Sequence, residues 1–163
     1  MASILNYLPP AEGLLPKWLL FISVVSMANS IQAYVSLAPT QRVYCGPAAT
    51  PTLNGSKLPA GVPPNTVRNT SPVTPLSART FGTWTAITAV VRLYAAYHIE
   101  NQAVYEMALW TFGVAWAHFM SEWWIFKTTR WGKGLAGPAA VSTGTLVWMW
   151  LQWDFYVKGG FAA

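Results

Sequence analysis

Residues 81–126 read FGTWTAITAVVRLYAAYHI, then ENQA, then VYEMALWTFGVAWAHFMSEWWIF, so that four residues separate two apolar stretches, 81–99 and 104–126. Each stretch can cross a bilayer core of about 30 Å as a helix, since this takes about 20 residues. Because the connection is so short, the two helices should form an antiparallel hairpin. This pair of stretches predicts that much of the chain lies in lipid.

Two further stretches, 18–37 and 138–157, are apolar over a similar length. The composition agrees, because 53% of the residues are hydrophobic and only 9% are charged, against roughly 25% charged in soluble domains. Helices satisfy their backbone hydrogen bonds internally, as hydrocarbon requires. The sequence therefore predicts an all-α integral membrane protein, a single domain (1–163) built as a four-transmembrane-helix bundle, with no separate soluble catalytic domain.

The basic residues are divided unevenly between the two sides of this bundle. Cytosolic loops of membrane proteins are enriched in Lys and Arg. The first and third connections hold most of these residues: Arg42, Lys57, Arg68, Arg79, Lys127, Arg130 and Lys133. Lys17 and Lys158 lie on the opposite side. We therefore expect loops one and three in the cytosol and both termini in the lumen, and the net charge of +5 needs no nucleic acid partner.

Residues 38–75 are rich in Pro, Thr and Ser and lack helical or strand periodicity. Such composition predicts a flexible Pro-rich loop between spans one and two. The segment contains two acceptor sequons, Asn54-Gly-Ser56 and Asn69-Thr-Ser71. Sequons are glycosylated only on the lumenal side, so the expected topology leaves both unmodified.

Five ionisable residues fall at membrane depth, where such groups need partners or water. Counting about 1.5 Å per residue puts Arg92 near the midplane, with Glu106 and Asp154 further toward the terminal side. We expect Arg92 to form an intramembrane ion pair with Glu106 or Asp154, because an unpaired buried charge is costly. His118 and Glu122 share one helix face, and we favour an interhelical hydrogen-bonding pair over a metal site or a proton relay.

The residue inventory argues against catalysis. A membrane di-iron centre needs many histidines, and this chain has only His98 and His118. The run Gly132-Lys-Gly-Leu-Ala-Gly137 matches a dinucleotide pattern, but that motif requires a preceding strand in a βαβ unit. We therefore expect no catalytic, cofactor-binding or metal-binding residues and no cofactor.

Several strings, in order along the chain, carry a resemblance to a known family. They include Leu14-Leu-Pro-Lys-Trp-Leu-Leu-Phe-Ile-Ser-Val-Val-Ser26, Leu76-Ser-Ala-Arg-Thr-Phe-Gly-Thr-Trp-Thr85, His118-Phe-Met-Ser-Glu122 and Gly132-Lys-Gly134. They resemble the ergosterol biosynthetic protein 28 family over nearly every span, and the second string is the most specific. The Pro-rich segment, about Cys45 to Pro75, looks like an insertion relative to shorter members.

This resemblance implies a non-catalytic scaffold of the endoplasmic reticulum membrane that serves ergosterol biosynthesis. It would tether the enzymes of sterol C-4 demethylation: the sterol C-4 methyl oxidase, the C-3 sterol dehydrogenase/decarboxylase and the 3-keto sterol reductase, with the sterol C-24 methyltransferase as a further associate. Tethering raises the effective concentration of one enzyme near the next. The family offers no catalytic residues to transfer.

The density of matching strings selects the residues that we expect to bind partners. These are Arg79, Thr80, Phe81, Gly82, Trp84, His118 and Glu122. In the expected topology all of them lie in the cytosolic half of the membrane. Three alternatives stay open: a sterol-binding or lipid-shuttling protein, a small transporter, and a lipid enzyme that uses His118 and Glu122. Contact with membrane lipid is expected in every case, and self-association as a homo-oligomer also stays open.

Overall fold

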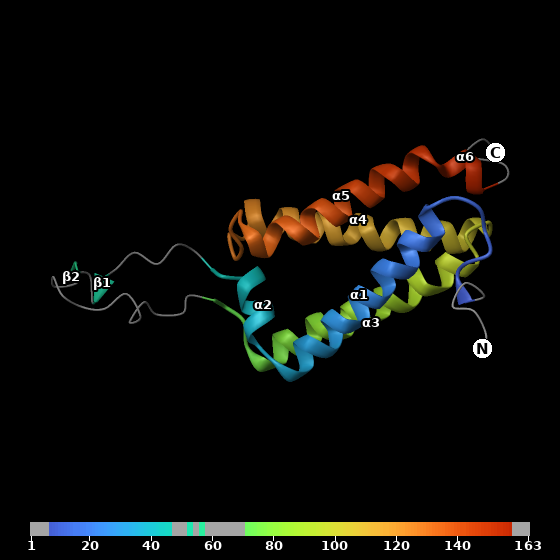
Figure 1. Cartoon of the computed structure of the whole chain (residues 1–163). Helices are drawn as coiled ribbons and strands as arrows, with labels where there is room; N and C mark the ends of the chain where they lie inside the picture. Colours follow the sequence, from blue (N-terminus) through green and yellow to red (C-terminus); the bar gives the residue numbers. More distant parts are fainter. Residues whose placement is uncertain (1–6, 47–51, 54–55, 58–70, 158–163) are drawn as a thin grey trace.

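The fold comes from a computed structural model, which describes residues 7–46, 52–53, 56–57 and 71–157 (Figure 1). Within these residues the regular secondary structure is helical except for one small strand pair, so the prediction of a helical fold is confirmed. The long helices are α1 (Leu15–Val35), α3 (Pro75–Tyr97), α4 (Gln102–Trp124) and α5 (Lys133–Leu151). The short elements are α2 (Ala38–Val43), α6 (Trp153–Tyr156) and the antiparallel pair β1 (Thr52–Leu53) and β2 (Ser56–Lys57).

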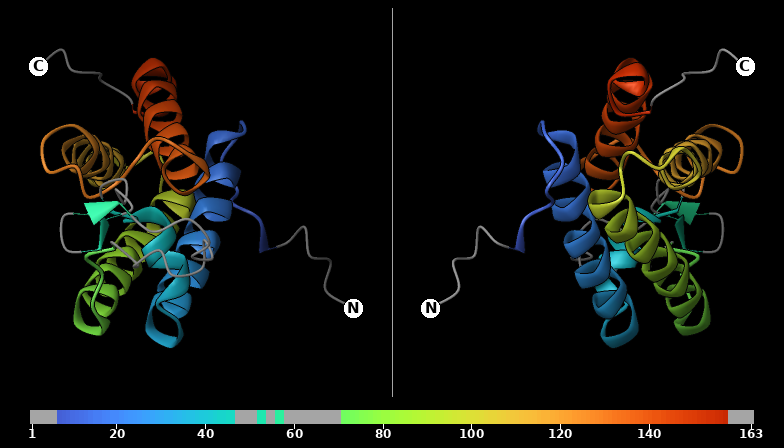
Figure 2. Two further views of the ribbon diagram at one scale, coloured as in Figure 1. Left: turned by 90° about the vertical axis from the view of Figure 1, so that its left-hand side faces the viewer. Right: turned by 90° about the vertical axis from the view of Figure 1, so that its right-hand side faces the viewer.

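The four long helices form two side-by-side pairs, α1 with α3 and α4 with α5 (Figures 1 and 2). The pairs meet at the end of the molecule that carries both ends of the described chain, and they separate toward α2 (Figure 1). The turn between α3 and α4 has the expected tightness, and Asn101 caps α4 by accepting a hydrogen bond from the backbone N–H of Val104 at 3.2 Å. The predicted short turn between these two helices is thus confirmed, but α3 and α4 belong to different pairs and diverge away from it (Figure 1).

The main core lies at the end where the pairs meet. It gathers buried side chains from every long helix, among them Leu15, Leu19, Ile99, Tyr105 and Met149. Two polar contacts cross this region: Tyr105 Oη donates to the Met149 carbonyl at 2.6 Å, and Trp18 Nε1 donates to Thr145 Oγ1 at 2.9 Å. Burial of this apolar surface joins the two helix pairs at this end. A smaller cluster toward α2 packs Phe81 and Trp84 of α3 against Phe119 of α4 and Leu135 of α5.

Small and hydroxyl-bearing residues bring α1 and α3 together. Ser23 Oγ donates to the Ala89 carbonyl and Ser30 Oγ to the Gly82 carbonyl, each at 2.7 Å. Such residues let helix backbones approach closely and bond across the interface in a membrane setting. Gly82 lies in this interface, where an added Cβ would come within 2.9 Å of the Tyr34 ring.

The helix boundaries differ from those expected. Helix α3 begins at Pro75 rather than at Phe81, because Thr74 and Ser77 form a reciprocal capping box before the apolar run. Helix α5 begins at Lys133, five residues before the apolar stretch 138–157, and therefore contains Pro138 in its interior. Helix α5 ends at Leu151, and the rest of the last apolar stretch forms the separate helix α6.

Part of the segment expected to be a flexible loop, 38–75, is regular structure. Its beginning forms α2 with Pro39 in the first turn, and it also contributes β1 and β2. Residues 47–51, 54–55 and 58–70 of this segment lie outside the described residues. The single-domain boundaries and the flexibility of the remaining loop therefore stay predictions.

By length and composition, one helix of the described chain qualifies as a candidate membrane span. This is α1, with a mean hydropathy of 1.4 over its 18-residue window. Helices α3 and α4 have 23 residues each and α5 has 19, but their Thr, Trp and Tyr residues lower the average. The helical fold matches the prediction, while four membrane crossings stay a prediction.

Candidate functional site

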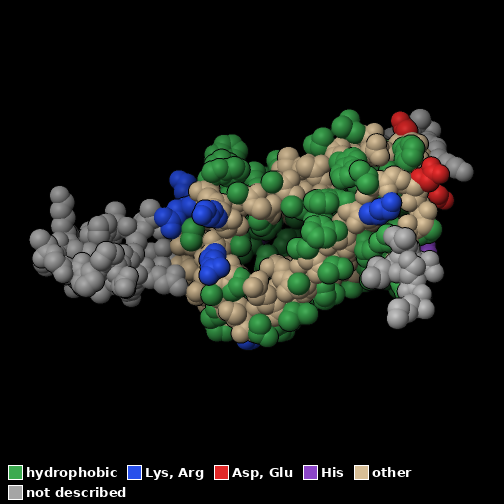
Figure 3. Space-filling model, viewed as in Figure 1, with side chains coloured by type: hydrophobic (Ala, Val, Ile, Leu, Met, Phe, Trp, Pro, Cys, Tyr) green, Lys and Arg blue, Asp and Glu red, His purple; other side chains and the backbone are tan. Residues whose placement is uncertain are grey.

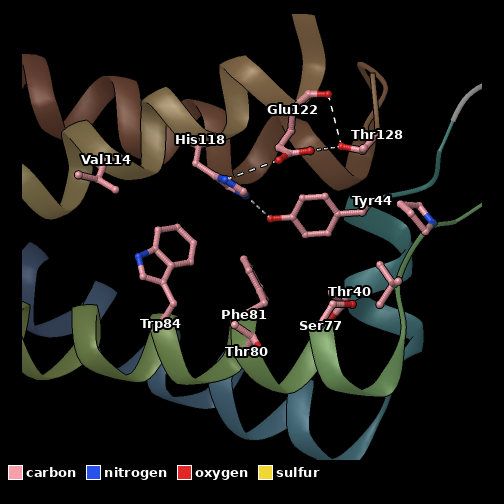
Figure 4. A pocket seen from close by; sticks show the side chains of 12 residues that line it. Thr40, Tyr44, Ser77, Thr80, Phe81, Trp84, Val114, His118, Glu122 and Thr128 are labelled. Atoms are coloured by element: carbon pink, nitrogen blue, oxygen red, sulfur yellow. Dashed lines mark hydrogen bonds and ion pairs between the residues drawn. The ribbon is translucent and has the colours of Figure 1, made fainter. Parts of the chain in front are cut away.

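The most informative site is a pocket of about 540 Å³ between α2, α3 and α4, which we call the Tyr44 pocket (Figure 4). It lies toward the end of the molecule where the helix pairs are apart. Its lining comes from three separate stretches of sequence: Thr40 and Tyr44, then Pro72 to Trp84, then Val114 to Thr128. Tertiary structure therefore creates this site from residues that are far apart in the chain.

Two contacts hold Tyr44 in place just beyond α2. Thr129 Oγ1 donates to the Val43 carbonyl at 2.5 Å, and the Gly46 N–H donates to the Thr128 carbonyl at 2.8 Å. Gly134, in the first turn of α5, lies directly against the Arg42 carbonyl with no room for a Cβ. The segment after α1 is thus fastened to the turn between α4 and α5.

A chain of polar groups runs along one wall of the pocket (Figure 4). Tyr44 Oη and His118 Nε2 share a hydrogen bond of 2.7 Å. On the other side of the ring, His118 Nδ1 lies 3.9 Å from Glu122 Oε1. Thr128 Oγ1 donates to the other carboxylate oxygen, Oε2. With the phenol as donor, Nε2 accepts and the ring proton sits on Nδ1, facing the carboxylate.

Burial raises the pKa of Tyr44 above its usual value, and the nearby Glu122 carboxylate raises it further. The phenol therefore keeps its proton at neutral pH and can donate to the imidazole. The expected hydrogen-bonding pair of His118 and Glu122 is at ion-pair distance but too long for a direct hydrogen bond. His118 hydrogen-bonds instead to Tyr44, which lies just beyond the end of α2.

Aromatic rings form the other walls. Tyr44 meets Phe81 edge-on with centroids 5.7 Å apart, and Trp84 meets His118 at 5.5 Å and 60°. Phe81 and Trp84 lie 5.6 Å apart. Tilted and edge-to-face arrangements of this kind are the favourable ones for aromatic pairs. The pocket thus combines a rigid apolar surface with a few fixed polar groups, which is the usual makeup of a recognition site.

The structure brings together most of the residues expected to bind partners. Thr80, Phe81 and Trp84 of α3 face His118 and Glu122 of α4 across the Tyr44 pocket (Figure 4).

Two of the selected residues lie elsewhere. Arg79 is exposed and does not line the pocket, and Gly82 is buried against α1. Sequence reasoning missed Tyr44, because it stands in a segment whose composition is typical of a loop.

The expected intramembrane ion pair is not formed. Within the described residues, Arg92 makes no ion pair with Glu106 or Asp154. Its guanidinium instead donates to Ser26 and Thr111. Both carboxylates lie toward the end of the molecule that carries the chain termini. Glu106, near the start of α4, accepts a hydrogen bond from Gln102, and Asp154 is exposed on α6. Hydroxyl groups on the facing helices therefore bind Arg92 in place of a carboxylate, and the sequence alone could not identify them as its partners.

No group of three or more His, Cys, Asp or Glu residues in the described part of the chain could hold a metal ion. His118 and Glu122 supply two ligand types, but their immediate partners are Tyr44 and Thr128. The Tyr44 pocket can therefore bind an apolar group, offer it hydrogen bonds and exclude water from it.

Comparison with known proteins identifies relatives over most of the chain. A family described as "Erg28 like protein" matches residues 15–147. Ergosterol biosynthetic protein 28 of Candida albicans is 49% identical over 90% of this chain and 90% of its own length. The protein of that name from Saccharomyces cerevisiae is 44% identical over 89% and 84%, and the mouse homolog is 31% identical over 84% and 83%. No solved structure matches.

Proposed function

The chain belongs to the Erg28 like protein family, and on this premise we propose that it serves ergosterol biosynthesis as a non-catalytic membrane scaffold. In this role it tethers the sterol C-4 methyl oxidase, the C-3 sterol dehydrogenase/decarboxylase and the 3-keto sterol reductase, with the sterol C-24 methyltransferase as a further associate. The names of its relatives support the pathway. The partners and the tethering are our proposal.

The observation that carries a membrane scaffold is the outward-facing apolar surface of the long helices. Large hydrophobic side chains are exposed on each of them, among them Phe21, Ile87, Trp110 and Trp150. Contiguous exposed apolar surface marks contact with a membrane or a protein. Together with the length of the helices, this supports four membrane crossings, through α1, α3, α4 and α5. We propose that the membrane is that of the endoplasmic reticulum, where the chain would encounter the sterol enzymes.

The charges support the orientation that we expect from the positive-inside rule. In Figure 3 most of the basic side chains in view gather at the end of the molecule near α2, while the acidic side chains in view gather at the opposite end, where a further basic side chain also lies. Basic loops stay on the cytosolic side. We therefore propose that the Tyr44 pocket lies on the cytosolic side, with both termini in the lumen.

The Tyr44 pocket is our proposed docking site for a demethylation enzyme. Its walls are aromatic, and aromatic side chains dominate the energetics of protein interfaces. Its polar groups, Tyr44 and His118, are already hydrogen-bonded to each other, so a partner finds a pre-formed surface.

The test is a double variant, Arg79→Ala with Trp84→Ala. Arg79 is exposed beside the pocket and Trp84 forms its wall, so the variant should insert into membranes normally and lose at least about tenfold in co-purified demethylation enzymes, as truncating an interface hot spot does. Trp110→Ala is the matched control, because Trp110 of α4 is 71% exposed and lies outside the pocket. Equal recovery of the enzymes with wild type and the double variant would remove the pocket as a docking site.

A sterol-binding role is the second candidate. A second cavity between the two helix pairs favours it; this cavity shares Thr40, Phe81 and Trp84 with the Tyr44 pocket and is also lined by Arg92.

A further inference from the structure

A second cavity, of about 370 Å³, lies in the wedge where the two helix pairs separate, and we call it the Arg92 cavity. Figure 3 shows the molecular surface hollowed between the pairs. All helices from α1 to α5 contribute to its lining, and α2 closes one end through Pro39, Thr40 and Val43. A volume of this size falls within the range of small-molecule sites.

One cation dominates the chemistry of this cavity. Arg92 is only 7% exposed, although it carries a full charge. Its Nη1 donates to Ser26 Oγ at 3.0 Å and its Nε to Thr111 Oγ1 at 3.1 Å. The guanidinium carbon also lies 4.0 Å from the centre of the Phe112 ring. Helices α1 and α4 therefore hold the guanidinium of α3 in a fixed orientation.

Arg92 has no counter-ion among the described residues, since the ion pair detected in that part of the chain joins His118 and Glu122. Neutral hydroxyls, one carbonyl and one aromatic face are its partners. A guanidinium has five N–H donors in a planar fork that matches a carboxylate, and Arg92 makes three hydrogen bonds. The remaining donors and the uncompensated charge suit an anion.

The rest of the lining is suited to an apolar body. Ile22, Val25, Phe119 and Val141 belong to it. The hydroxyls of Thr85, Thr88 and Ser142 donate back to carbonyls of their own helices, which reduces the polarity that they present. An occupant with one charged group on an apolar skeleton would satisfy both parts of the cavity.

We propose that the Arg92 cavity binds a sterol carboxylic acid, with the carboxylate on the Arg92 guanidinium and the ring system between the helix pairs. The choice of a sterol acid rests on the proposed function. An oxidase acting on a C-4 methyl group and a decarboxylase that removes that carbon must share an intermediate in which the carbon is a carboxyl group. The scaffold then holds the intermediate that one tethered enzyme makes and the next consumes.

The experiment measures binding to the purified full-length chain in lipid nanodiscs. Three radiolabelled probes are compared: a sterol 4-carboxylic acid, its neutral 4-hydroxymethyl analogue, and oleate. The sterol acid should bind saturably and at least about tenfold more tightly than the neutral analogue, which is the range of a hydrogen bond to a charged group. It should also bind more tightly than oleate, which has the carboxylate but lacks the rigid ring system. Equal binding of the neutral analogue would overturn the role of charge, and equal binding of oleate would overturn the sterol assignment.

Two variants of Arg92 test the residue directly. Arg92→Gln keeps hydrogen-bonding capacity without charge and should lose the preference for the acid, while Arg92→Lys keeps the charge and should retain part of it. An unchanged preference in Arg92→Gln contradicts the proposal.

Because Arg92→Gln can disturb folding, a cavity-filling pair provides a second test. Val25 lines the cavity and is 45% exposed, and its neighbour Val24 is 60% exposed and lies outside the lining. Val25→Trp should therefore reduce binding of the sterol acid at least about tenfold while Val24→Trp leaves it unchanged. Full binding by Val25→Trp places the probe elsewhere and overturns the site.

Co-purification of the demethylation enzymes is read separately. If the acid does not bind to a chain that captures its enzymes, the inference fails and the proposed scaffold stands. If the acid binds to a chain that captures no enzymes, the scaffold fails and the cavity stands.

Discussion

At the scale of single residues, Tyr44 and Arg92 show how helices far apart in sequence are joined by polar groups. Tyr44 reaches His118 of α4 from the segment after α2, and Arg92 of α3 reaches Ser26 of α1 and Thr111 of α4. In each case the partner on the facing element is a neutral group. Buried polar groups are costly unless they are hydrogen-bonded, so these contacts define which helix faces which.

The hydroxyl of Tyr44 can be removed without loss of its ring. Tyr44→Phe should lower the free energy of unfolding by about 1 kcal/mol, because His118 Nε2 loses its partner. In a protein of this size the midpoint of thermal unfolding should fall by about 2 to 4 °C, measured in detergent by intrinsic fluorescence.

Tyr34→Phe is the control for this measurement. The Tyr34 hydroxyl bonds to Thr83 Oγ1 at 2.6 Å, but the pair is exposed, so its removal should change the midpoint little. An equal fall in both variants would mean that the bond to His118 has no special weight.

At the scale of elements, glycines distinguish the interface between α1 and α3 from the free face of α5. An added Cβ at Gly82 would lie 2.9 Å from the Tyr34 ring and 3.1 Å from the Ser30 carbonyl oxygen. A Cβ at Gly144 would meet nothing within 4 Å. The same substitution should therefore act in opposite directions at the two positions.

Gly82→Ala should lower the free energy of unfolding by about 1 to 3 kcal/mol, since α1 and α3 must move apart. Gly144→Ala should raise it by about 0.5 to 1 kcal/mol, since alanine is the better helix former. Urea titration of the detergent-solubilised protein gives both values. Stabilisation by Gly82→Ala would contradict the close packing of these helices.

At the scale of the whole molecule, charge is unevenly distributed along the long axis: most of the basic side chains in view lie toward α2 and the acidic ones in view lie toward the opposite end (Figure 3), while Glu122 lies in the Tyr44 pocket. This polarity matches the division of Lys and Arg between the connections in the sequence. It also puts the Tyr44 pocket toward the basic end. The orientation in the membrane therefore decides which compartment the pocket faces.

The two natural sequons test this orientation. With the first loop in the cytosol, Asn54 and Asn69 should carry no glycan, so that glycosidase treatment leaves the mobility of the protein on a gel unchanged. An acceptor sequon appended after Ala163 should be glycosylated, because we expect the C-terminus in the lumen. Glycosylation at Asn54 or Asn69 would place the first loop in the lumen and contradict the proposed topology.

The sequence by itself determined the helical class, the short turn between α3 and α4 and five of the twelve residues that line the Tyr44 pocket. Long apolar runs and a short connection suffice for the first two, and Phe81, Trp84, His118 and Glu122 belong to strings that resemble a family. The positions of the helix ends were harder to predict from the sequence, because the capping box that begins α3 lies before the apolar run from which the helix was predicted.

Only the tertiary structure decided which groups meet. It brought Tyr44 to His118, gave Arg92 hydroxyl partners in place of Glu106 or Asp154, and opened a cavity between the helix pairs. The physical reason is that hydrophobic patterning depends on neighbours along one helix, whereas polar partners depend on the rotation and spacing of separate helices. Those are set by the packing of all helices together.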